Sequence, residues 1–527
     1  MLNKSAVRHL VISFSLANLL FLKLWMKLLP YNKDSGSSFF LPASPFNTYL
    51  AVMLNVLIWG LAFFLLLHVA RDCNRLYARI YLVIFSLVAI AAVYGVGNSY
   101  ITLAKFIVQY GHKSAICLEA ACILVWCIWM VLIIKYCERM ARICAVIPLL
   151  FAPLLPLTFC EATMALFRME PAAMFHPHRI DPPGSLRNPL GVNVVWMIFD
   201  EMDYRLNFEK RPSWLALPAF DAFRKDALFA TSAYSPSNAT HVSLPALLTG
   251  IPLTSTEAVG ARRLDLLPVN SSSRLDFAAQ ETVFDRARKR GGSTALFGWF
   301  LPYARVMHGV DLCRDYPRYS FYTSDDLLKV IIMQWVEIWD IRFLPFSNTL
   351  LGNNHIGIVT NMQSDVMDTV KHQDPTFMFL HYPVPHYPNI YNRKTGALLF
   401  NRNSREGYFD NMALADRLMG EVRSEMERKG TWDRALVILS ADHHWRNNTY
   451  DGHIDYEHVP FMVKLPYQHG GETYGGKFNT VLTQGLVLAV LEGTVKTPED
   501  ASLWLDHNSR TTDGRKVMFS IDQPDAD

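Results

Sequence analysis

The stretch that decides the fold is Val192–Glu201, which reads Val-Asn-Val-Val-Trp-Met-Ile-Phe-Asp-Glu. This nearly continuous β-branched and aromatic run is typical of a strand buried on both faces of a parallel sheet. Further strands are predicted at Thr294–Trp299, Phe377–Leu380, Ala435–Leu439 and Val459–Lys464. Helical patterns lie between them, at Leu217–Leu228 and Tyr408–Lys429. Such alternation predicts an α/β domain with helices on both faces of its sheet.

Polar residues follow three of these strands directly. They are Asp200-Glu201, the segment from His381 to His386, and Asp442-His443. Active sites of α/β sheets gather at the carboxyl ends of strands. We therefore expect these residues to contribute to one site.

The first third of the chain is dominated by long apolar runs. Five of them approach the roughly 17–25 residues that cross a bilayer: Leu10–Leu29, Tyr49–Ala70, Ile80–Val96, Ile116–Ile134 and Ile143–Phe159. The first run lacks the small-residue cleavage site of a secretory signal, so we interpret it as retained. The sequence thus predicts an α-helical membrane domain of five spans over residues 1–165, a Pro-rich linker over 166–190 and a catalytic domain over 191–527.

Charges between the runs predict which side the catalytic domain occupies. Basic residues cluster before the first run and in the loops after the second and fourth: Lys4, Arg8, Arg71, Arg75, Arg79, Lys135, Arg139 and Arg142. Short basic loops stay cytoplasmic, so the catalytic domain is expected on the other side. Lys23 and Lys27 run against this pattern, and snorkelling or contact with lipid phosphates would explain them. The net charge of +3 gives no reason to expect nucleic-acid binding.

The segment Asp325–Phe346 is unusually apolar for an exported domain. One interpretation is a helix in the core of that domain. The other is a helix lying on the membrane surface, which would bring the active site to lipid head groups.

The segment Ser235–Gly250 places Thr240 in a polar loop that runs into an apolar helix. A hydroxyl there lies at a helix N-terminus, where unpaired N–H groups and the helix dipole favour an anion. Read as structure alone, Thr240 would be a helix N-cap. Together with the acidic strand end and the Asp-His pair, it predicts a metal-activated nucleophile.

Zinc binds Asp, Glu and His side chains and polarises a bound oxygen. Asp442 and His443 are well placed as ligands, and Glu201 or Asp200 would supply the third. Thr240 would be both the fourth ligand and the nucleophile. The structural alternatives are a carboxylate that caps a turn, a solvated histidine and an acidic helix cap.

Two loop histidines complete the predicted catalytic set, His386 and His458. Either would bind a second metal, hold a transferring phosphoryl oxygen or protonate a leaving group. Arg446 would clamp an anionic oxygen of the substrate, with a surface salt bridge as its alternative. Three further histidines rank below these: His381, His444 and His453.

The order of these motifs resembles the alkaline phosphatase/sulfatase superfamily. With five spans ahead of the domain, the chain resembles bacterial phosphoethanolamine transferases and lipoteichoic acid synthases. The resemblance implies an alkaline phosphatase-like fold and a nucleophile at Thr240, within Thr240-His241-Val242-Ser243-Leu244-Pro245. It also implies site roles for Asp442, His443, Glu201 (or Asp200), His458 and His386.

The implied reaction is metal-dependent transfer of phosphoethanolamine or phosphoglycerol from a membrane phospholipid to an envelope lipid or glycan, through a phosphothreonine. The implied cofactor is one or two divalent ions, zinc first, with manganese or calcium as alternatives. The implied location is a bacterial inner membrane, with the catalytic domain on the periplasmic side. The alternatives are a membrane-tethered phosphodiesterase or phosphatase, or another sulfatase-like hydrolase, with the same site, and an inactive membrane sensor or scaffold.

At two points the sequence differs from members of this superfamily. Lipid A phosphoethanolamine transferases carry cysteines around the nucleophile segment, where this chain has Ser235 and Ala246. The Cys/Ser-x-Pro-x-Arg motif of true sulfatases does not occur in Tyr234–Gly250, which argues against formylglycine-type sulfate hydrolysis.

Overall fold

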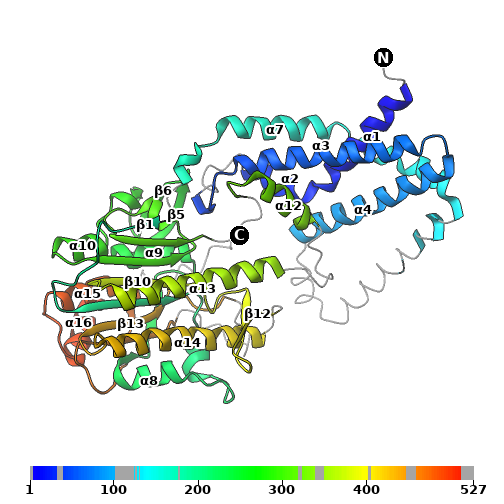
Figure 1. The fold of residues 1–527 in the computed structure, drawn as a ribbon. Helices are drawn as coiled ribbons and strands as arrows, with labels where there is room; N and C mark the ends of the chain where they lie inside the picture. Colours follow the sequence, from blue (N-terminus) through cyan, green and yellow to red (C-terminus); the bar gives the residue numbers. More distant parts are fainter. Residues whose placement is uncertain are drawn as a thin grey trace. The chain divides into compact units, whose positions relative to one another are not determined.

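The computed structural model describes residues 4–31, 39–100, 124, 128–129, 131–133, 135–175, 179–317, 323–338, 349–401, 405–446 and 458–511. The chain divides into two compact units (Figure 1). The first consists of Met1–Ala173 and Ser320–Ser347, and the second of Met174–Tyr319 and Asn348–Asp527. The first unit is therefore built from two separate stretches of sequence.

The first unit is helical. Its helices are α1 (Lys4–Leu20), α2 (Leu22–Tyr31), α3 (Phe46–Val69), α4 (Asn74–Tyr100), α6 (Val146–Leu150), α7 (Leu154–Arg168) and α12 (Leu327–Ile338). In the described part of the chain, three helical stretches are long and apolar enough to span a membrane: Phe46–Val69, Asn74–Val93 and Lys135–Arg168. The pair α1 and α2, bent by 62°, would make a fourth. These helices indicate membrane anchoring.

Of the five-span prediction, only the presence of three or four long apolar helices is supported. The fourth predicted run, Ile116–Ile134, lies almost wholly outside the described residues. The first run is confirmed as apolar helix, but it is broken between α1 and α2 rather than continuous.

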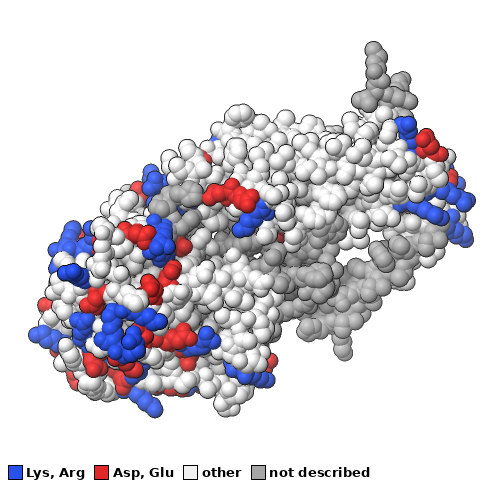
Figure 2. Space-filling model, in the orientation of Figure 1, with Lys and Arg blue, Asp and Glu red and all other residues white. Residues whose placement is uncertain are grey.

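Helix α3 shows how this unit is built. One side of α3, including Val52 and Val56, is buried in a core shared with Leu16 and Leu20 of α1. The other side exposes large apolar side chains: Leu57, Ile58, Leu61, Leu65 and Leu66. A helix that is apolar all round suits a hydrocarbon surrounding rather than water. Figure 2 shows the same unit as a largely uncharged surface, with a cluster of Lys and Arg at one end.

The predicted interpretation of Asp325–Phe346 as a core helix of the catalytic domain is wrong for the described residues up to Ile338. These residues form α12, which belongs to the first unit and packs against α3. The indole of Trp335 stacks on that of Trp59, with ring centroids 4.0 Å apart. An apolar helical pattern fits either setting, so the pattern alone did not separate them.

The second unit is built on a nine-stranded sheet in the order β1-β9-β8-β10-β2-β13-β14-β3-β15. The bounds are β1 Arg179–Ile180, β2 Asn193–Phe199, β3 Leu228–Ala230, β8 Thr294–Trp299, β9 Leu312–Tyr316, β10 Phe377–Tyr382, β13 Ala435–Ala441, β14 Phe461–Lys464 and β15 Glu472–Tyr474. The centre, from β9 through β8, β10 and β2 to β13, is parallel, whereas β14 runs antiparallel to both of its neighbours. All five strands predicted from the sequence are present.

Helices cover both faces of this sheet, as predicted. Val195 and Met197 of β2 share a core with residues of α8 (Pro218–Asp226), α13 (Thr349–His372) and α14 (Arg405–Lys429). On the opposite face, Phe284 of α10 (Val283–Lys289) packs edge-on against Phe377, 4.9 Å away between ring centroids. Helices α9 (Thr240–Thr249) and α15 (Thr483–Leu491) contact each other and α10. Because β10 and β13 each pair in parallel with β2, the carboxyl ends of these three strands lie side by side.

Candidate active site

The candidate site lies at the ends of the three central strands. Asp200 directly follows β2, and Asp442 directly follows β13. The two strands are paired so that Phe199 lies opposite Ala441. Because both strands end at this level, the register carries the two carboxylates to neighbouring positions.

Asp200, Asp442 and His443 form one buried cluster. One potential ligand atom from each lies within 4.8 Å of those of the other two. The Nε2 atom of His443 is 3.6 Å from an oxygen of Asp200 and 3.4 Å from Oδ2 of Asp442. None of the three is more than 1% exposed.

The imidazole of His443 is held in a metal-binding form. Its Nδ1 lies 2.8 Å from the backbone carbonyl oxygen of His444. A carbonyl only accepts, so Nδ1–H donates and the lone pair of Nε2 faces the cluster. Burial lowers the pKa of His443 to about 4, so the ring is neutral at physiological pH.

The cluster fits a divalent cation. Among the described residues, neither oxygen of Asp200 nor Oδ2 of Asp442 accepts a hydrogen bond, although all three atoms are buried. Burial and the neighbouring carboxylate of Asp442 raise the pKa of Asp200 well above its usual value. Buried carboxylates are costly unless they are paired or coordinate a metal. Two carboxylates and one neutral imidazole are a donor set that divalent ions, zinc among them, accept.

Thr240 is the first residue of α9, as the sequence predicted, but it is not the helix cap. The N-cap position is Ala239, which makes no side-chain capping bond. The hydroxyl oxygen of Thr240 instead lies 3.2 Å from Nε2 of His443. One turn later, the hydroxyl of Ser243 donates to the carbonyl of Ser237, 3.0 Å away. Thr240 is therefore the hydroxyl of α9 that faces the cluster.

Glu201 lies beside the cluster, but its carboxylate pairs with Arg446. Its backbone has a φ of 62°, which is uncommon for a residue with a side chain. Its N–H donates to Oδ1 of Asp442, 3.2 Å away, while its Oε1 lies 3.1 Å from Nε of Arg446. The structure thus places Asp200 in the cluster and pairs the predicted anion clamp, Arg446, with Glu201.

His386 is placed beside the strand end. Its backbone N–H donates to the carbonyl of Asp200, 3.1 Å away, and its ring packs edge-on against Trp299. The buried amide of Asn411 donates to three carbonyls of the surrounding loop, those of Pro385, His386 and Pro388. This one side chain fixes the course of the loop that carries the imidazole.

His458 lies three residues before β14, in an isolated β-bridge with Tyr234. Its ring packs against those of Tyr234 and Tyr204, with centroid distances of 4.4 and 5.8 Å. Its backbone carbonyl accepts from the N–H of Tyr204. His444 is buried next to the cluster and supplies the carbonyl that orients His443. His453 lies outside the described residues.

His381 is closer to the cluster than its low rank in the sequence suggested. It is fully buried on β10, and its Nδ1 lies 3.2 Å both from the carbonyl oxygen of Trp299 and from the hydroxyl of Tyr303. Its Nε2 points toward Asp200, 4.0 Å from Oδ2. The available signal was its place near a strand end, but only the pairing of His381 with Ile198, two residues before Asp200, brings its ring close to that carboxylate.

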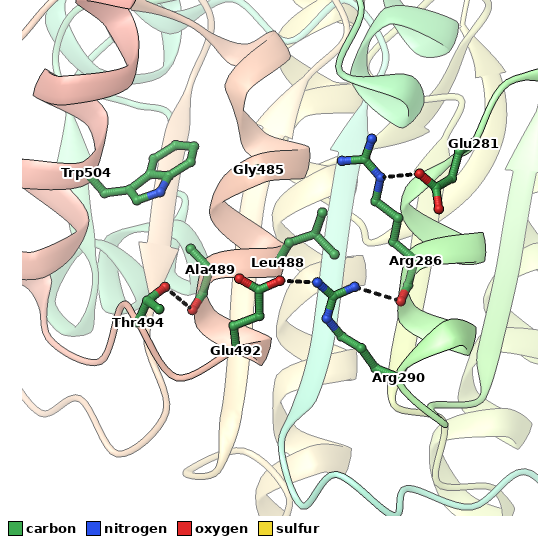
Figure 3. A pocket seen from close by; sticks show the side chains of 9 residues that line it. All are labelled: Glu281, Arg286, Arg290, Gly485, Leu488, Ala489, Glu492, Thr494 and Trp504. Carbon is green, nitrogen blue, oxygen red and sulfur yellow. Dashed lines mark hydrogen bonds and ion pairs between the residues drawn. The ribbon is translucent and has the colours of Figure 1, made fainter.

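A separate hollow of about 470 Å³ lies away from these residues (Figure 3). It contains two ion pairs: Arg286 donates to Glu281, 3.1 Å away, and Arg290 pairs with Glu492. None of the predicted site residues lines it. Its charged groups satisfy one another, so we assign it no catalytic role.

Fold and site together define an α/β domain of the alkaline phosphatase type, with a buried group of side chains that fits a divalent metal. The family model described as Sulfatase matches residues 192–474, more than half of the chain. The chain therefore belongs to the sulfatase family, within the superfamily of enzymes that act on phosphate and sulfate esters. No curated protein gives a significant match.

Solved structures show more distant similarity. The crystal structure of Ps i-CgsB with k-i-k-neocarrahexaose is 15% identical over 60% of this chain and 74% of its own, with a TM-score of 0.40. The phosphonate monoester hydrolase of Agrobacterium radiobacter is 15% identical over 58% of this chain and 77% of its own, with a TM-score of 0.38. An alkaline phosphatase superfamily protein from Vibrio parahaemolyticus is 14% identical over 61% and 71%, with a TM-score of 0.38.

Proposed function

We propose that this protein is a membrane-anchored transferase that moves phosphoethanolamine or phosphoglycerol from a phospholipid to a lipid or glycan of the cell envelope. The observation that carries the proposal is the hydroxyl of Thr240, 3.2 Å from Nε2 of His443 in the buried cluster. A hydroxyl at a helix N-terminus beside metal-binding side chains suits nucleophilic attack on a phosphodiester.

In the first step, the oxygen of Thr240 attacks phosphorus. A bond between that oxygen and phosphorus forms, and the bond from phosphorus to the diacylglycerol oxygen breaks. Thr240 loses its proton as the new bond forms, and the oxygen of the departing diacylglycerol takes up a proton, so the step balances. The products are a phosphothreonine carrying the head group and free diacylglycerol.

A divalent ion held by Asp200, Asp442 and His443 would lower the pKa of the Thr240 hydroxyl and offset negative charge on the phosphoryl group. The chain itself orients the reactants. Tyr408 donates to the carbonyl of Glu201, 2.7 Å away, and so fixes the turn that carries Asp200. We assign His386 and His458 to protonating the leaving oxygen and contacting the phosphoryl group, and Arg446 to the substrate's anionic oxygens.

In the second step, an acceptor hydroxyl or phosphate attacks the phosphothreonine. The bond from phosphorus to Thr240 breaks, the head group passes to the acceptor and Thr240 recovers a proton. If water took the acceptor's place, the same site would act as a phosphodiesterase. The apolar helices of the first unit favour the lipid donor, since both the phospholipid and the departing diacylglycerol reside in a bilayer.

The test uses the full-length protein with vesicles of phosphatidylethanolamine or phosphatidylglycerol. Intact-mass spectrometry should find a head-group adduct on the wild-type protein, and peptide mapping should place it on Thr240. Thr240→Ala should carry no adduct. Ser243→Ala is the matched control, because Ser243 is a hydroxyl of the same helix that bonds to Ser237 instead of the cluster. It should carry the adduct.

Two results would overturn the transferase. An adduct on Thr240→Ala would remove the nucleophile from the scheme. Free phospho-alcohol released at the full rate, with no acceptor product when envelope lipids and glycans are supplied, would establish hydrolysis instead.

A further inference from the structure

Helix α12 follows α3 along its first half. At the start of both helices, the amide of Asn47 donates to the carbonyls of Ser324 and Asp325, at 3.0 and 2.9 Å. Further along, the amide of Asn55 donates to Oε1 of Gln334, 3.1 Å away. These contacts, in the same order along both helices, show that the two run in the same direction.

The contact furthest along the two helices shows how far α12 runs beside α3. Trp59, twelve residues after Asn47, stacks on Trp335. At a rise of 1.5 Å per residue, α12 accompanies α3 for about 18 Å. The hydrocarbon core of a bilayer is about 30 Å thick, so this is roughly half a span.

Gln334 and Glu337 of α12 are buried within the first unit. Oε1 of Glu337 lies 3.0 Å from Nζ of Lys23 and 2.9 Å from Nζ of Lys27. Lys23 and Glu337 are both nearly inaccessible, and the amide of Gln334 also donates to the carbonyl of Thr48. Buried charges at such a depth need partners. Glu337 therefore explains the two lysines that ran against the charge pattern of the sequence.

Apart from the exposed Lys329 in its first turn, the outward face of α12 is apolar. Leu328, Ile332 and Val336 are spaced by four residues and are 66%, 52% and 38% exposed. This stripe accompanies α3, whose Ile58 and Leu61 are each 52% exposed within a candidate span. Lys329 excepted, α12 turns its polar side chains inward and its apolar stripe outward, which is the polarity expected in lipid, not in water.

We propose that α12 is a half-spanning helix that the catalytic half of the chain inserts into the bilayer beside α3, with Leu328, Ile332 and Val336 against phospholipid acyl chains. Its polar side chains lock it in place through Asn55 and the lysines of α2. This membrane contact is separate from the proposed transfer reaction and stands whether or not that reaction is correct.

The insertion also bears on topology. The start of α12 lies at the Phe46 end of α3, where the amide of Asn47 donates to the carbonyl of Ser324. The exposed Arg71 and Arg75 lie just beyond the other end of α3. Our proposal therefore has α12 enter the bilayer at the membrane face opposite the two arginines. This is the exported side predicted from the charges.

The test is spin-label accessibility in proteoliposomes of the full-length protein, with its eight cysteines replaced. Single labels at Leu328, Ile332 and Val336 should be relaxed strongly by oxygen and weakly by a water-soluble nickel chelate. Leu61→Cys provides the lipid-facing reference. Leu503→Cys is the matched control, because Leu503 is a leucine of a helix in the catalytic unit that is 68% exposed. It should show the opposite ratio.

Each outcome decides the proposal. Nickel access at Ile332 equal to that at Leu503 would overturn it, because the stripe would then face water. Protection from both reagents would also overturn it, because protein would then cover the stripe. A second measurement guards against disturbance by the labels: phospholipid with a photoreactive acyl chain should crosslink to the α12 peptide of the unlabelled protein. Failure to crosslink, with crosslinks to α3 present, would contradict lipid contact.

Discussion

The hydroxyl oxygen of Thr240 lies 3.2 Å from Nε2 of His443, across 203 residues of sequence. The first residue of a helix and the second residue after a strand meet here because α9 begins near the carboxyl ends of the central strands. The imidazole lone pair faces Thr240, since Nδ1–H is engaged by the carbonyl of His444. The geometry makes Thr240 the hydroxyl that lies beside the nitrogen His443 would offer to a metal.

Removing that hydroxyl should stop the reaction without unfolding the protein. We expect Thr240→Ala to lower turnover of a phosphodiester roughly 10³-fold or more, while Thr240→Ser keeps measurable activity. Steady-state kinetics in detergent, beside thermal unfolding of each variant, measures this. Activity of Thr240→Ala close to that of the wild type would contradict the assignment.

Substitutions of Asp200 and Glu201 should have different effects on the amount of metal that the protein binds. Asp200→Asn is expected to lose the bound metal, because Asp200 supplies unsatisfied buried oxygens to the cluster. Glu201→Gln should retain it, since the carboxylate of Glu201 pairs with Arg446. Elemental analysis of the purified full-length variants tests both. The reverse result would identify Glu201 as the metal ligand. The backbone at these two residues would then have to rotate to bring its carboxylate into the cluster.

Gly298 should be intolerant of a side chain. A Cβ at this position would lie 2.3 Å from Cε2 of Tyr303, whose hydroxyl contacts His381. We expect Gly298→Ala to cost about 1–3 kcal/mol through overpacking, visible as a lower unfolding temperature, and to reduce activity. Gly475→Ala is the control, with no atom within 4 Å of the added carbon. Equal stability of the two variants would refute the close contact.

Asp416 should make stability depend on pH. Burial raises the pKa of Asp416 from its usual 3.8 to about 6, and its carboxylate accepts from the N–H of Phe220. The folded state then holds the proton more tightly than the unfolded state, so this group's contribution is full below about pH 4 and falls until about pH 6. The loss is on the order of 2–3 kcal/mol.

The check is a comparison with Asp416→Asn. The difference in the free energy of unfolding between the two proteins should change across that window, in favour of the variant at higher pH. A difference that stays constant with pH would show that Asp416 does not titrate there.

Much of this protein follows from local patterns. Buried strands were predicted from β-branched runs, and the helix start at Thr240 from a polar segment entering an apolar one. The sulfatase match and the Asp442-His443 pair agree with those patterns. Local sequence suffices here because strand burial and helix initiation depend on neighbouring residues.

The choice between Asp200 and Glu201, and the place of His381, were decided only by the folded chain. Adjacent carboxylates look alike in a sequence, but the left-handed backbone at Glu201 and its partner Arg446 direct one of them away. Likewise His381 reaches Asp200 through the register of β10 against β2.

Helix α12 makes the same point most plainly. Its sequence determined that it is an apolar helix, whereas its partners, Lys23 of α2 and Trp59 of α3, lie hundreds of residues earlier. Side-chain periodicity is a property of the local backbone, so the sequence fixes which faces are apolar. Which surface those faces meet depends on contacts between distant segments, and these exist only once the chain has folded.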